Sequence, residues 1–295
     1  MLNKTLVIGA SGYIGGKLFD HYRQRFSDCI GTSFSNVDNK FTHFSLEKSR
    51  FSDLAINIDE YKTVIICAAI TDIAFVNDEP EHCYQMNVNN TLTLIQDINA
   101  LGLHVIYLSS DNVFSGDKGK YIDSSDTLPI SEYGKQKLAV EKGIEKLSGN
   151  YTIVRLSKIV GVERGDTTII DDIYQQLNSH QEIKAAEDLI FNPTYIGDVL
   201  RVIDIIQENK IFGILNFCNV ENWNRHQLTE IISERLKLPN DKIKKVKFAS
   251  FDATRPRPLN TTMINSRVFN DFNFTSIDKC ITLFAGSITA YKPNL

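Results

Sequence analysis

The sequence lacks the features that mark membrane, metal-binding or disulfide-stabilised proteins. No apolar run approaches the length of a membrane-spanning helix, and the stretch Leu6–Ala10 is too short for a signal peptide. The five cysteines are scattered without a CxxC pair, and the six histidines show no ligand spacing. We therefore expect reduced, mostly buried thiols, no structural metal, and a cytoplasmic protein without a membrane partner.

A surplus of positive charge is also missing. The formal net charge is −4 at pH 7, so the surface offers little attraction to a phosphate backbone or an anionic membrane. The hydrophobic fraction of 42% and the charged fraction of 23% are typical of a globular protein. These numbers exclude a disordered or fibrous class and make nucleic acid an unexpected partner.

The first half of the chain alternates β-rich runs with amphipathic stretches. Several of the runs are continuously apolar, which is typical of strands buried on both faces of a parallel sheet. The pattern predicts an α/β fold with a doubly wound, Rossmann-like parallel sheet. The expected strands are Thr5–Gly9, Asp28–Thr32, Thr42–Leu46, Thr63–Ala68, Val105–Ser109 and Thr152–Leu156, and the expected helices are Gly15–Phe26, Glu81–Ala100 and Tyr133–Leu147.

The pattern changes after Arg155. Tyr195–Glu208 and Arg225–Leu236 read as helices and Ile214–Asn216 as a short strand, and one helix is expected between Ser157 and Asn192. We predict a larger domain at residues 1–156 and a smaller mixed α/β lobe at 157–295. Segments near 193–217 are expected to return to the first domain.

A glycine-rich turn follows the first expected strand. Gly9 permits the tight turn, Gly12 lets the backbone approach a pyrophosphate, and Gly15 lets the following helix pack close to the strand. Free N–H groups at the start of that helix attract phosphate. We therefore predict that residues 1–156 bind a dinucleotide through Gly9, Ser11, Gly12, Tyr13, Ile14 and Gly15.

The end of the second expected strand bears on the choice of dinucleotide. A NAD enzyme usually offers Asp or Glu there to the adenosine ribose, whereas Cys29–Phe34 contains no acid. The hydroxyls of Thr32 and Ser33 can bond a 2′-phosphate without repelling it. NADP is therefore the favoured cofactor, and NAD is the alternative.

Tyr133 and Lys137 stand four residues apart, on one face of an expected helix. A phenol titrates near pH ~10, and an ammonium about one turn away stabilises its phenolate. Ser110 ends the strand that begins at Val105, where doubly wound sheets place active-site residues. The three residues together predict an NAD(P)-dependent oxidoreductase in which Tyr133 handles the proton.

Motifs along nearly the whole chain resemble those of the dTDP-4-dehydrorhamnose reductase family of extended short-chain dehydrogenases/reductases. The spacing GxxGxxG at Gly9–Gly15 is similar to that of the superfamily. Ser109–Gly116 resembles S-T-D-Y-V-F-x-G, and Pro129–Glu141 resembles P-x-x-x-Y-G-x-(S/T)-K-L-x-x-E. Further similar segments are Cys67–Thr71, Asn87–Asn89, Asn192–Asp198 and Arg255–Pro256.

The resemblance implies that Ser110, Tyr133 and Lys137 are catalytic and that Lys137 also binds the nicotinamide ribose. Hydride would pass to the keto carbon of a nucleotide-linked 4-keto-6-deoxyhexose, in deoxysugar and polysaccharide biosynthesis. The family pattern places Ala68, Ala69 and Thr71 at the cofactor, and Asp111, Asn112, Lys158, Asn192 and Arg255 at the nucleotide sugar. The apolar faces Met86/Leu92/Ile95 and Leu138/Ile144/Leu147 belong either to the core or to a homodimer interface, as in many relatives.

Two departures from the family concern the sugar. Asn112 stands where the reductases usually carry Tyr, and Lys158 stands where rhamnose-forming members tend to carry Trp. The same catalytic set also serves nucleotide-sugar epimerases and dehydratases, and dehydratases usually add an acid beside the hydroxyl, as Asp111 is beside Ser110. Some relatives are instead regulatory subunits of methionine adenosyltransferase, which leaves a non-catalytic NADP-binding protein as a third interpretation.

Overall fold

The computed structural model describes residues 4–27, 29–34, 40–147, 149–179, 181–251 and 256–290. The chain forms two compact units, each with its own apolar core. The first unit consists of Met1–Val113, Thr127–Arg155 and Leu200–Leu215, and the second of Phe114–Asp126, Leu156–Val199 and Asn216–Leu295. Each unit therefore consists of three separate segments of the chain.

The first unit is built on a seven-stranded parallel sheet with the order β11-β6-β5-β4-β1-β2-β3. The chain adds β2 and β3 on one side of β1 and then crosses back to place β4 on the other side. The predicted doubly wound α/β fold is confirmed. The strands are β1 Lys4–Ile8, β2 Ile30–Ser33, β3 Thr42–His43, β4 Tyr61–Ile66, β5 His104–Ser110, β6 Tyr151–Leu156 and β11 Gly213–Phe217.

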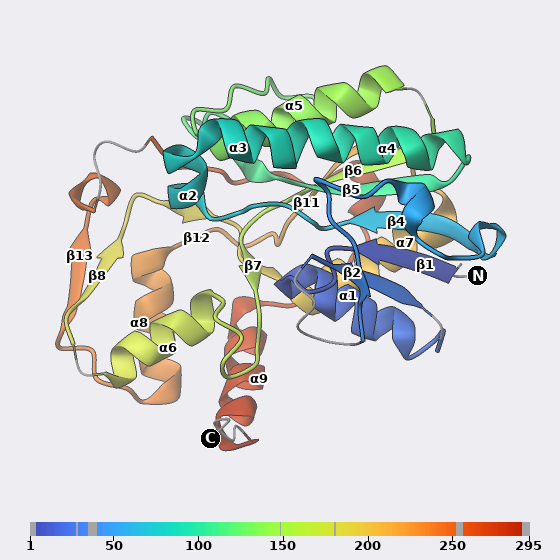
Figure 1. Cartoon of the computed structure of the whole chain (residues 1–295). Helices are drawn as coiled ribbons and strands as arrows, with labels where there is room; N and C mark the ends of the chain where they lie inside the picture. The colour runs from blue at the N-terminus through green and yellow to red at the C-terminus, as the bar shows by residue number, and fades with distance from the viewer. Residues whose placement is uncertain are drawn as a thin grey trace. The chain divides into compact units, whose positions relative to one another are not determined.

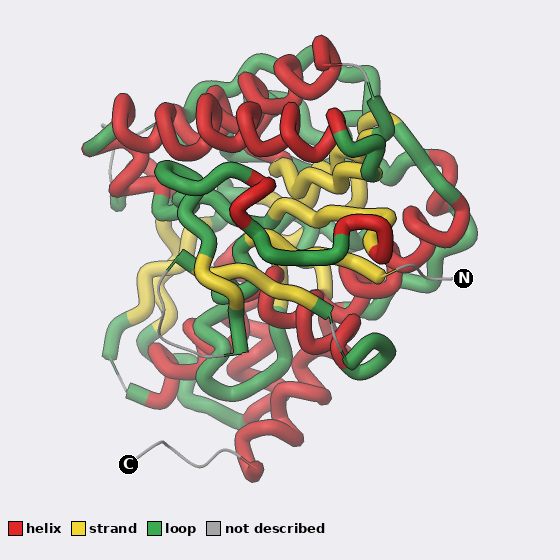
Figure 2. The backbone as a smooth tube through the Cα atoms, turned by 45° about the vertical axis from the view of Figure 1, so that its right-hand side comes forward, coloured by secondary structure: helices red, strands yellow, loops and turns green. Residues whose placement is uncertain are grey.

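Helices cover both faces of this sheet. Figure 1 shows α4 and α5 along one face and α1 and α7 along the other, and Figure 2 shows the same layers from a second direction. The central strands are apolar on both sides because both faces are covered, as the continuous run Leu6–Ile8 illustrates. The helical segments are α1 Tyr13–Arg23, η1 Phe51–Asp53, η2 Ile58–Glu60, α2 Ile73–Asp78, α3 Pro80–Tyr84, η3 Gln85–Asn90 (π-helical), α4 Thr91–Ala100, η4 Asp111–Val113, α5 Glu132–Leu147 and α7 Ile196–Asn209.

The second unit packs three helices against short strand pairs. The sequence analysis expected α8 and one helix in the region of α6, but it did not anticipate α9 or the parallel pair of β8 and β13. The apolar faces of α6, α8 and α9 share one core. The elements are β7 Ile159–Val160, α6 Ile169–Asn178, β8 Ile183–Ala186, β9 Ile190–Phe191, β10 Thr194–Tyr195, β12 Trp223–Asn224, α8 Arg225–Leu236, β13 Ile243–Val246, η5 Phe248–Ser250, η6 Arg267–Phe269 and α9 Ile277–Ala290.

Candidate active site

The glycine-rich turn lies between β1 and α1, at the point where the strand order reverses. Gly9 has a positive φ of 85°, and a Cβ placed there would lie 2.6 Å from the backbone nitrogen of Ala68. A Cβ at Gly15 would lie 2.2 Å from the Gly9 carbonyl oxygen. Both positions therefore require glycine, because any side chain would push the turn away from β4 or from α1.

Gly12 is different, because nothing in the protein crowds it. A Cβ there would meet only the Gly9 carbonyl oxygen, at 3.5 Å, and the residue is exposed. Gly12 is also the N-cap of α1 and contributes no side-chain hydrogen bond to the helix. The exposed turn residues Ser11 and Gly12 and the half-buried Tyr13 and Ile14 thus surround the N-terminus of a helix, an arrangement that fits a pyrophosphate.

Thr32 and Ser33 end β2 beside this turn. The Thr32 hydroxyl accepts a hydrogen bond from the Gly9 N–H at 3.2 Å, and the Thr32 carbonyl accepts one from the Ala10 N–H at 2.7 Å. Both side chains are buried, with Thr32 only 1% exposed. Thr32 therefore supports the glycine turn, and the contact of either hydroxyl with a 2′-phosphate stays a prediction.

The segment after β4 forms the opposite side of the strand-order reversal. Ala68 and Ala69 are half-buried there and Thr71 is exposed. The buried Asn87, in the π-helical turn η3, accepts from the Ile70 N–H at 2.7 Å and donates to the Ile70 carbonyl at 2.9 Å. Its amide also donates to Gln136 of α5 at 2.8 Å, which ties this segment to the helix that carries Tyr133 and Lys137.

Ser110, Tyr133 and Lys137 come together in the first unit at the end of β5. The Ser110 hydroxyl donates to the Asp111 carboxylate at 3.1 Å, and it lowers the pKa of the Tyr133 phenol. The Lys137 ammonium donates to the Leu108 carbonyl at 2.8 Å and lies 5.8 Å from the centre of the Tyr133 ring. A substrate carbonyl near Ser110 and Tyr133 would thus meet two hydroxyl donors.

The charges around Tyr133 differ from the expectation drawn from the sequence. Burial and the Asp111 carboxylate raise the pKa of the Tyr133 phenol, and the bond with Ser110 lowers it. The Lys137 ammonium is directed to the Leu108 carbonyl, so the charge that governs the phenol is that of Asp111 rather than that of Lys137. Tyr133 is therefore protonated at neutral pH, and its raised pKa makes the phenol a weaker acid than an exposed tyrosine.

Lys137 itself is buried above an aromatic ring. Its Nζ lies 4.7 Å from the centre of the buried Tyr107 ring. Burial lowers the pKa of Lys137 to about 8, against smaller opposing contributions from Cys67 and Glu141. Burial also raises the pKa of the Cys67 thiol to about 12, so this thiol is protonated at neutral pH.

Two residues that the sequence analysis gave no role hold α5 in place. Glu141, one turn after Lys137, forms a buried ion pair with Arg155 of β6, with Nη2 to Oε2 at 2.7 Å. The Ser109 hydroxyl donates to the same carboxylate. The motif contained Glu141, but nothing in local spacing pointed to Arg155, since the two residues lie on different elements.

Gly134 explains how α5 reaches the Ser110 segment. A Cβ at this position would lie 2.1 Å from the Asn112 carbonyl oxygen. The glycine next to Tyr133 therefore lets the helix backbone approach η4 more closely than any other residue would allow. The sequence placed this glycine within a motif, but its packing role appears only in three dimensions.

The expected substrate residues fall in both units. Asp111 and Asn112 lie in the first unit beside Ser110, whereas Lys158 and Asn192 belong to the second unit, and Arg255 lies outside the described residues. Lys158 is exposed. Their contacts with a nucleotide sugar stay predictions.

The side-chain amide of Asn192 is hydrogen-bonded to other residues of the protein. It is 1% exposed; its amide oxygen accepts from the Met263 N–H at 2.8 Å, and its amide nitrogen donates to Asn222 at 2.8 Å and to the Glu221 carbonyl at 3.2 Å. These bonds join three separate segments of the second unit. The side chain therefore organises the backbone of this unit.

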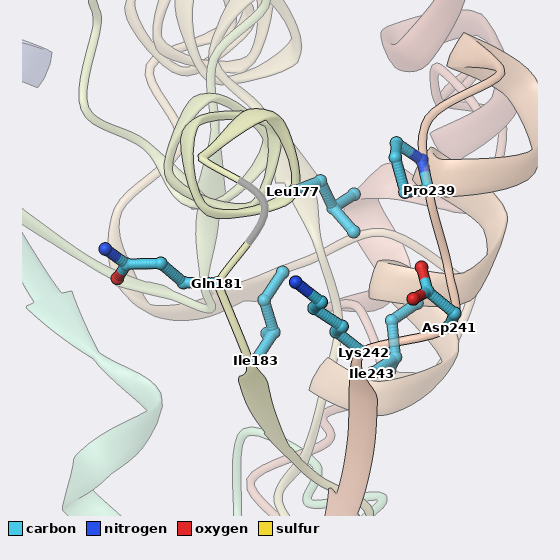
Figure 3. A pocket seen from close by; sticks show the side chains of 7 residues that line it. All are labelled: Leu177, Gln181, Ile183, Pro239, Asp241, Lys242 and Ile243. Atoms are coloured by element: carbon cyan, nitrogen blue, oxygen red, sulfur yellow. The ribbon is translucent and has the colours of Figure 1, made fainter.

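A pocket elsewhere in the described residues is the next feature considered as a site. A small pocket in the second unit lies at the C-terminal end of α6 and the turn before β13 (Figure 3), and it is lined by Leu177, Gln181, Ile183, Pro239, Asp241, Lys242 and Ile243. Among the described residues, no cluster of His, Cys, Asp and Glu could hold a metal ion, and no helix is long and apolar enough to cross a membrane.

Comparison with known proteins identifies relatives over nearly the whole chain. A family model described as the RmlD substrate binding domain matches residues 3–278. The chain is 24% identical over 274 residues to methionine adenosyltransferase 2 subunit beta from Xenopus tropicalis, covering 90% of this chain and 81% of that protein. It is 22% identical over 261 residues to dTDP-4-dehydrorhamnose reductase from Mycobacterium tuberculosis, covering 86% and 82%.

A solved structure shows the same fold. The dTDP-4-dehydrorhamnose reductase from Bacillus anthracis, in complex with NADP, matches with a TM-score of 0.82 at 20% sequence identity. The match covers 99% of this chain and 100% of that one. Both units of the chain therefore have counterparts in one solved fold.

Proposed function

Because the chain belongs to the RmlD substrate binding domain family, we propose that it is an NAD(P)H-dependent reductase of a nucleotide-linked 4-keto-6-deoxyhexose. The observation that carries the proposal is the meeting of Ser110, Tyr133 and Lys137 at the end of β5.

The turn Gly9–Gly15 supports a dinucleotide cofactor, because the crowded glycines hold it against β4 and α1 while Gly12 leaves room for phosphate. When bound, the reduced nicotinamide supplies the hydride to the keto carbon of the sugar. NADP is our preferred cofactor, since the end of β2 carries hydroxyls instead of an acid, and the Bacillus anthracis relative is a complex with NADP.

The residues of this chain would handle the oxygen and the proton. Ser110 would donate a hydrogen bond to the carbonyl oxygen, and Tyr133 would transfer its phenolic proton to the same oxygen as negative charge develops there. The resulting phenolate would be stabilised by the Ser110 hydroxyl. Asp111 opposes that phenolate, so Tyr133 carries its proton when the substrate binds.

The test is the oxidation of NADPH and NADH with a panel of nucleotide-linked 4-keto-6-deoxyhexoses. We expect stoichiometric loss of reduced cofactor with at least one panel member, and a fall in kcat of about 10²–10⁴-fold in Tyr133→Phe. Tyr84→Phe is the matched control, since Tyr84 is an exposed tyrosine of α3. NADPH should bind Tyr133→Phe as it binds the wild type, as judged by its fluorescence.

Two results would contradict the proposal. Turnover of Tyr133→Phe at the wild-type rate would remove Tyr133 from the mechanism. Conversion of a nucleotide sugar without net consumption of NADPH would assign the protein to the epimerases or dehydratases, because these return the hydride to the substrate.

The similarity to methionine adenosyltransferase 2 subunit beta favours a second candidate function, that of a regulatory NADP-binding subunit. This candidate requires a stable complex with a methionine adenosyltransferase catalytic chain and a change in the activity of that chain. Size-exclusion chromatography of the mixed proteins tests it. A stable complex together with no turnover of any panel sugar would replace our first proposal by this one.

A further inference from the structure

Asn112 surrounds the Ser110 hydroxyl with hydrogen-bond donors. Its backbone N–H and its side-chain Nδ2–H both donate to Ser110 Oγ, each at 3.2 Å. The same Nδ2 donates to Asp111 Oδ1 at 2.9 Å. One residue thus contacts both the hydroxyl and the carboxylate that lie beside Tyr133.

These contacts decide which way the Ser110 hydroxyl faces. A hydroxyl has one proton to donate and two lone pairs that accept. The two N–H groups of Asn112 occupy the accepting side, so Ser110 keeps its proton for other partners. In the structure the acceptor is Asp111 Oδ1, at 3.1 Å.

We propose that Asn112 is a positioning residue that holds the Ser110 hydroxyl as a hydrogen-bond donor toward the reacting carbonyl oxygen. The inference rests on the proposed reductase function and extends it. A carbonyl oxygen can only accept, so a serine whose lone pairs are already filled is oriented before the substrate arrives. The bond from Nδ2 to Asp111 also takes up accepting capacity of the carboxylate that competes for the Ser110 proton.

Asn112 departs from the motif that the chain otherwise resembles. The related motif usually carries Tyr here, and a tyrosine side chain has no N–H group to offer Ser110. Asn112 therefore provides a local hydrogen-bond arrangement that the family pattern does not supply.

Two substitutions separate a donor role from a role in filling space. Asn112→Asp keeps the size and shape of the side chain but replaces the donating nitrogen by an accepting oxygen. Asn112→Ala removes the side chain and keeps the backbone donor. If Asn112 only fills space, Asn112→Asp should be the milder change, whereas a donor role makes it the more severe one.

We expect kcat to fall about tenfold in Asn112→Ala and about hundredfold in Asn112→Asp, with the KM for NADPH unchanged in both and the thermal unfolding temperature unchanged in Asn112→Ala. Asn150→Asp, an exposed asparagine in the first unit, controls for the change in charge and should match the wild type. The inference is overturned if Asn112→Asp is as active as Asn112→Ala or more so, or if KM for NADPH rises while kcat is unchanged.

A crystal structure of Asn112→Asp tests the inference without any turnover. We expect the Ser110 side chain to have turned so that its hydroxyl faces the new carboxylate. If the wild type reduces no sugar of the panel, the proposed function fails, and the Ser110 conformer still decides the inference. A Ser110 hydroxyl unmoved in Asn112→Asp would reject it even if the wild type were an active reductase.

Discussion

At the scale of single residues, Lys137 shows how the site holds a charge in an apolar place. Its Nζ is buried between the Leu108 carbonyl, at 2.8 Å, and the face of the Tyr107 ring. A charged hydrogen bond and a cation–π contact offset part of the loss of hydration. The offset is incomplete, because the pKa of Lys137 still falls to about 8 from an ordinary value of 10.5.

This pKa has a consequence for stability. Between pH 8 and 10.5 the unfolded chain holds a proton on Lys137 that the folded chain has released, so unfolding takes up a proton. The free energy of unfolding contributed by Lys137 therefore increases with pH across this window and is constant below it. The limiting slope is about 1.4 kcal/mol per pH unit.

We expect the unfolding free energy of the wild type, relative to that of Lys137→Met, to rise between pH 8 and pH 10. Urea denaturation of both proteins at several pH values measures this difference, in which the titration of all other groups cancels. A difference that stays flat across the window would mean that Lys137 is not perturbed by burial.

At the scale of secondary-structure elements, α5 organises the site. Tyr133 and Lys137 face the end of β5, Gln136 bonds Asn87 of η3, and Glu141 pairs with Arg155 of β6. One helical face therefore connects the sheet to the segment after β4. The spacing in the sequence predicted that Tyr133 and Lys137 share a face, and the packing supplied the partners of Gln136 and Glu141.

The buried pair in this arrangement is expected to matter far more than a similar pair at the surface. Arg155 and Glu141 are 3% and 1% exposed, so Arg155→Met would leave a carboxylate buried without its cation. We expect this variant to lose about 3–5 kcal/mol of unfolding free energy in urea denaturation.

Arg50→Met is the matched control. Arg50 also donates hydrogen bonds from two nitrogens to one carboxylate, that of Asp97, but its side chain is 63% exposed. Water and salt screen that pair, so the control should remain close to the wild type. Equal losses in both variants would show that burial of the Arg155 pair has no special importance.

At the scale of the whole molecule, the chain joins two units that each have an apolar core. The glycine turn, β4 and α5 all belong to the first unit. A dinucleotide bound there would stabilise the folded form by mass action. Nucleotide binding can therefore be followed through stability, without knowledge of the sugar.

We expect NADPH at one hundred times its dissociation constant to add about 2.7 kcal/mol to the stability of the first unit and so to raise the thermal unfolding temperature. Gly15→Ala should lose this shift, because its Cβ would lie 2.2 Å from the Gly9 carbonyl oxygen. Gly286→Ala, where a Cβ meets nothing within 4 Å, should keep it. An equal NADPH shift in Gly15→Ala would place the nucleotide elsewhere.

The sequence by itself predicted the doubly wound sheet, the glycine-rich turn and the shared helical face of Tyr133 and Lys137. These depend on local physics: apolar runs form buried strands, glycines in a strand–turn–helix context form a phosphate turn, and a spacing of four residues puts Tyr133 and Lys137 on one helical face. The doubly wound fold is confirmed on this basis.

Only the tertiary structure decided how these parts act on one another. Packing brings together the side chains and backbone groups of three sets of contacts. These are the ion pair of Glu141 with Arg155, the hydrogen bonds of Asn87 with Ile70, and the hydrogen bonds of Asn112 with Ser110. The same holds for the charge beside Tyr133, which proved to be Asp111 rather than Lys137, because burial and direction set a pKa and spacing alone does not.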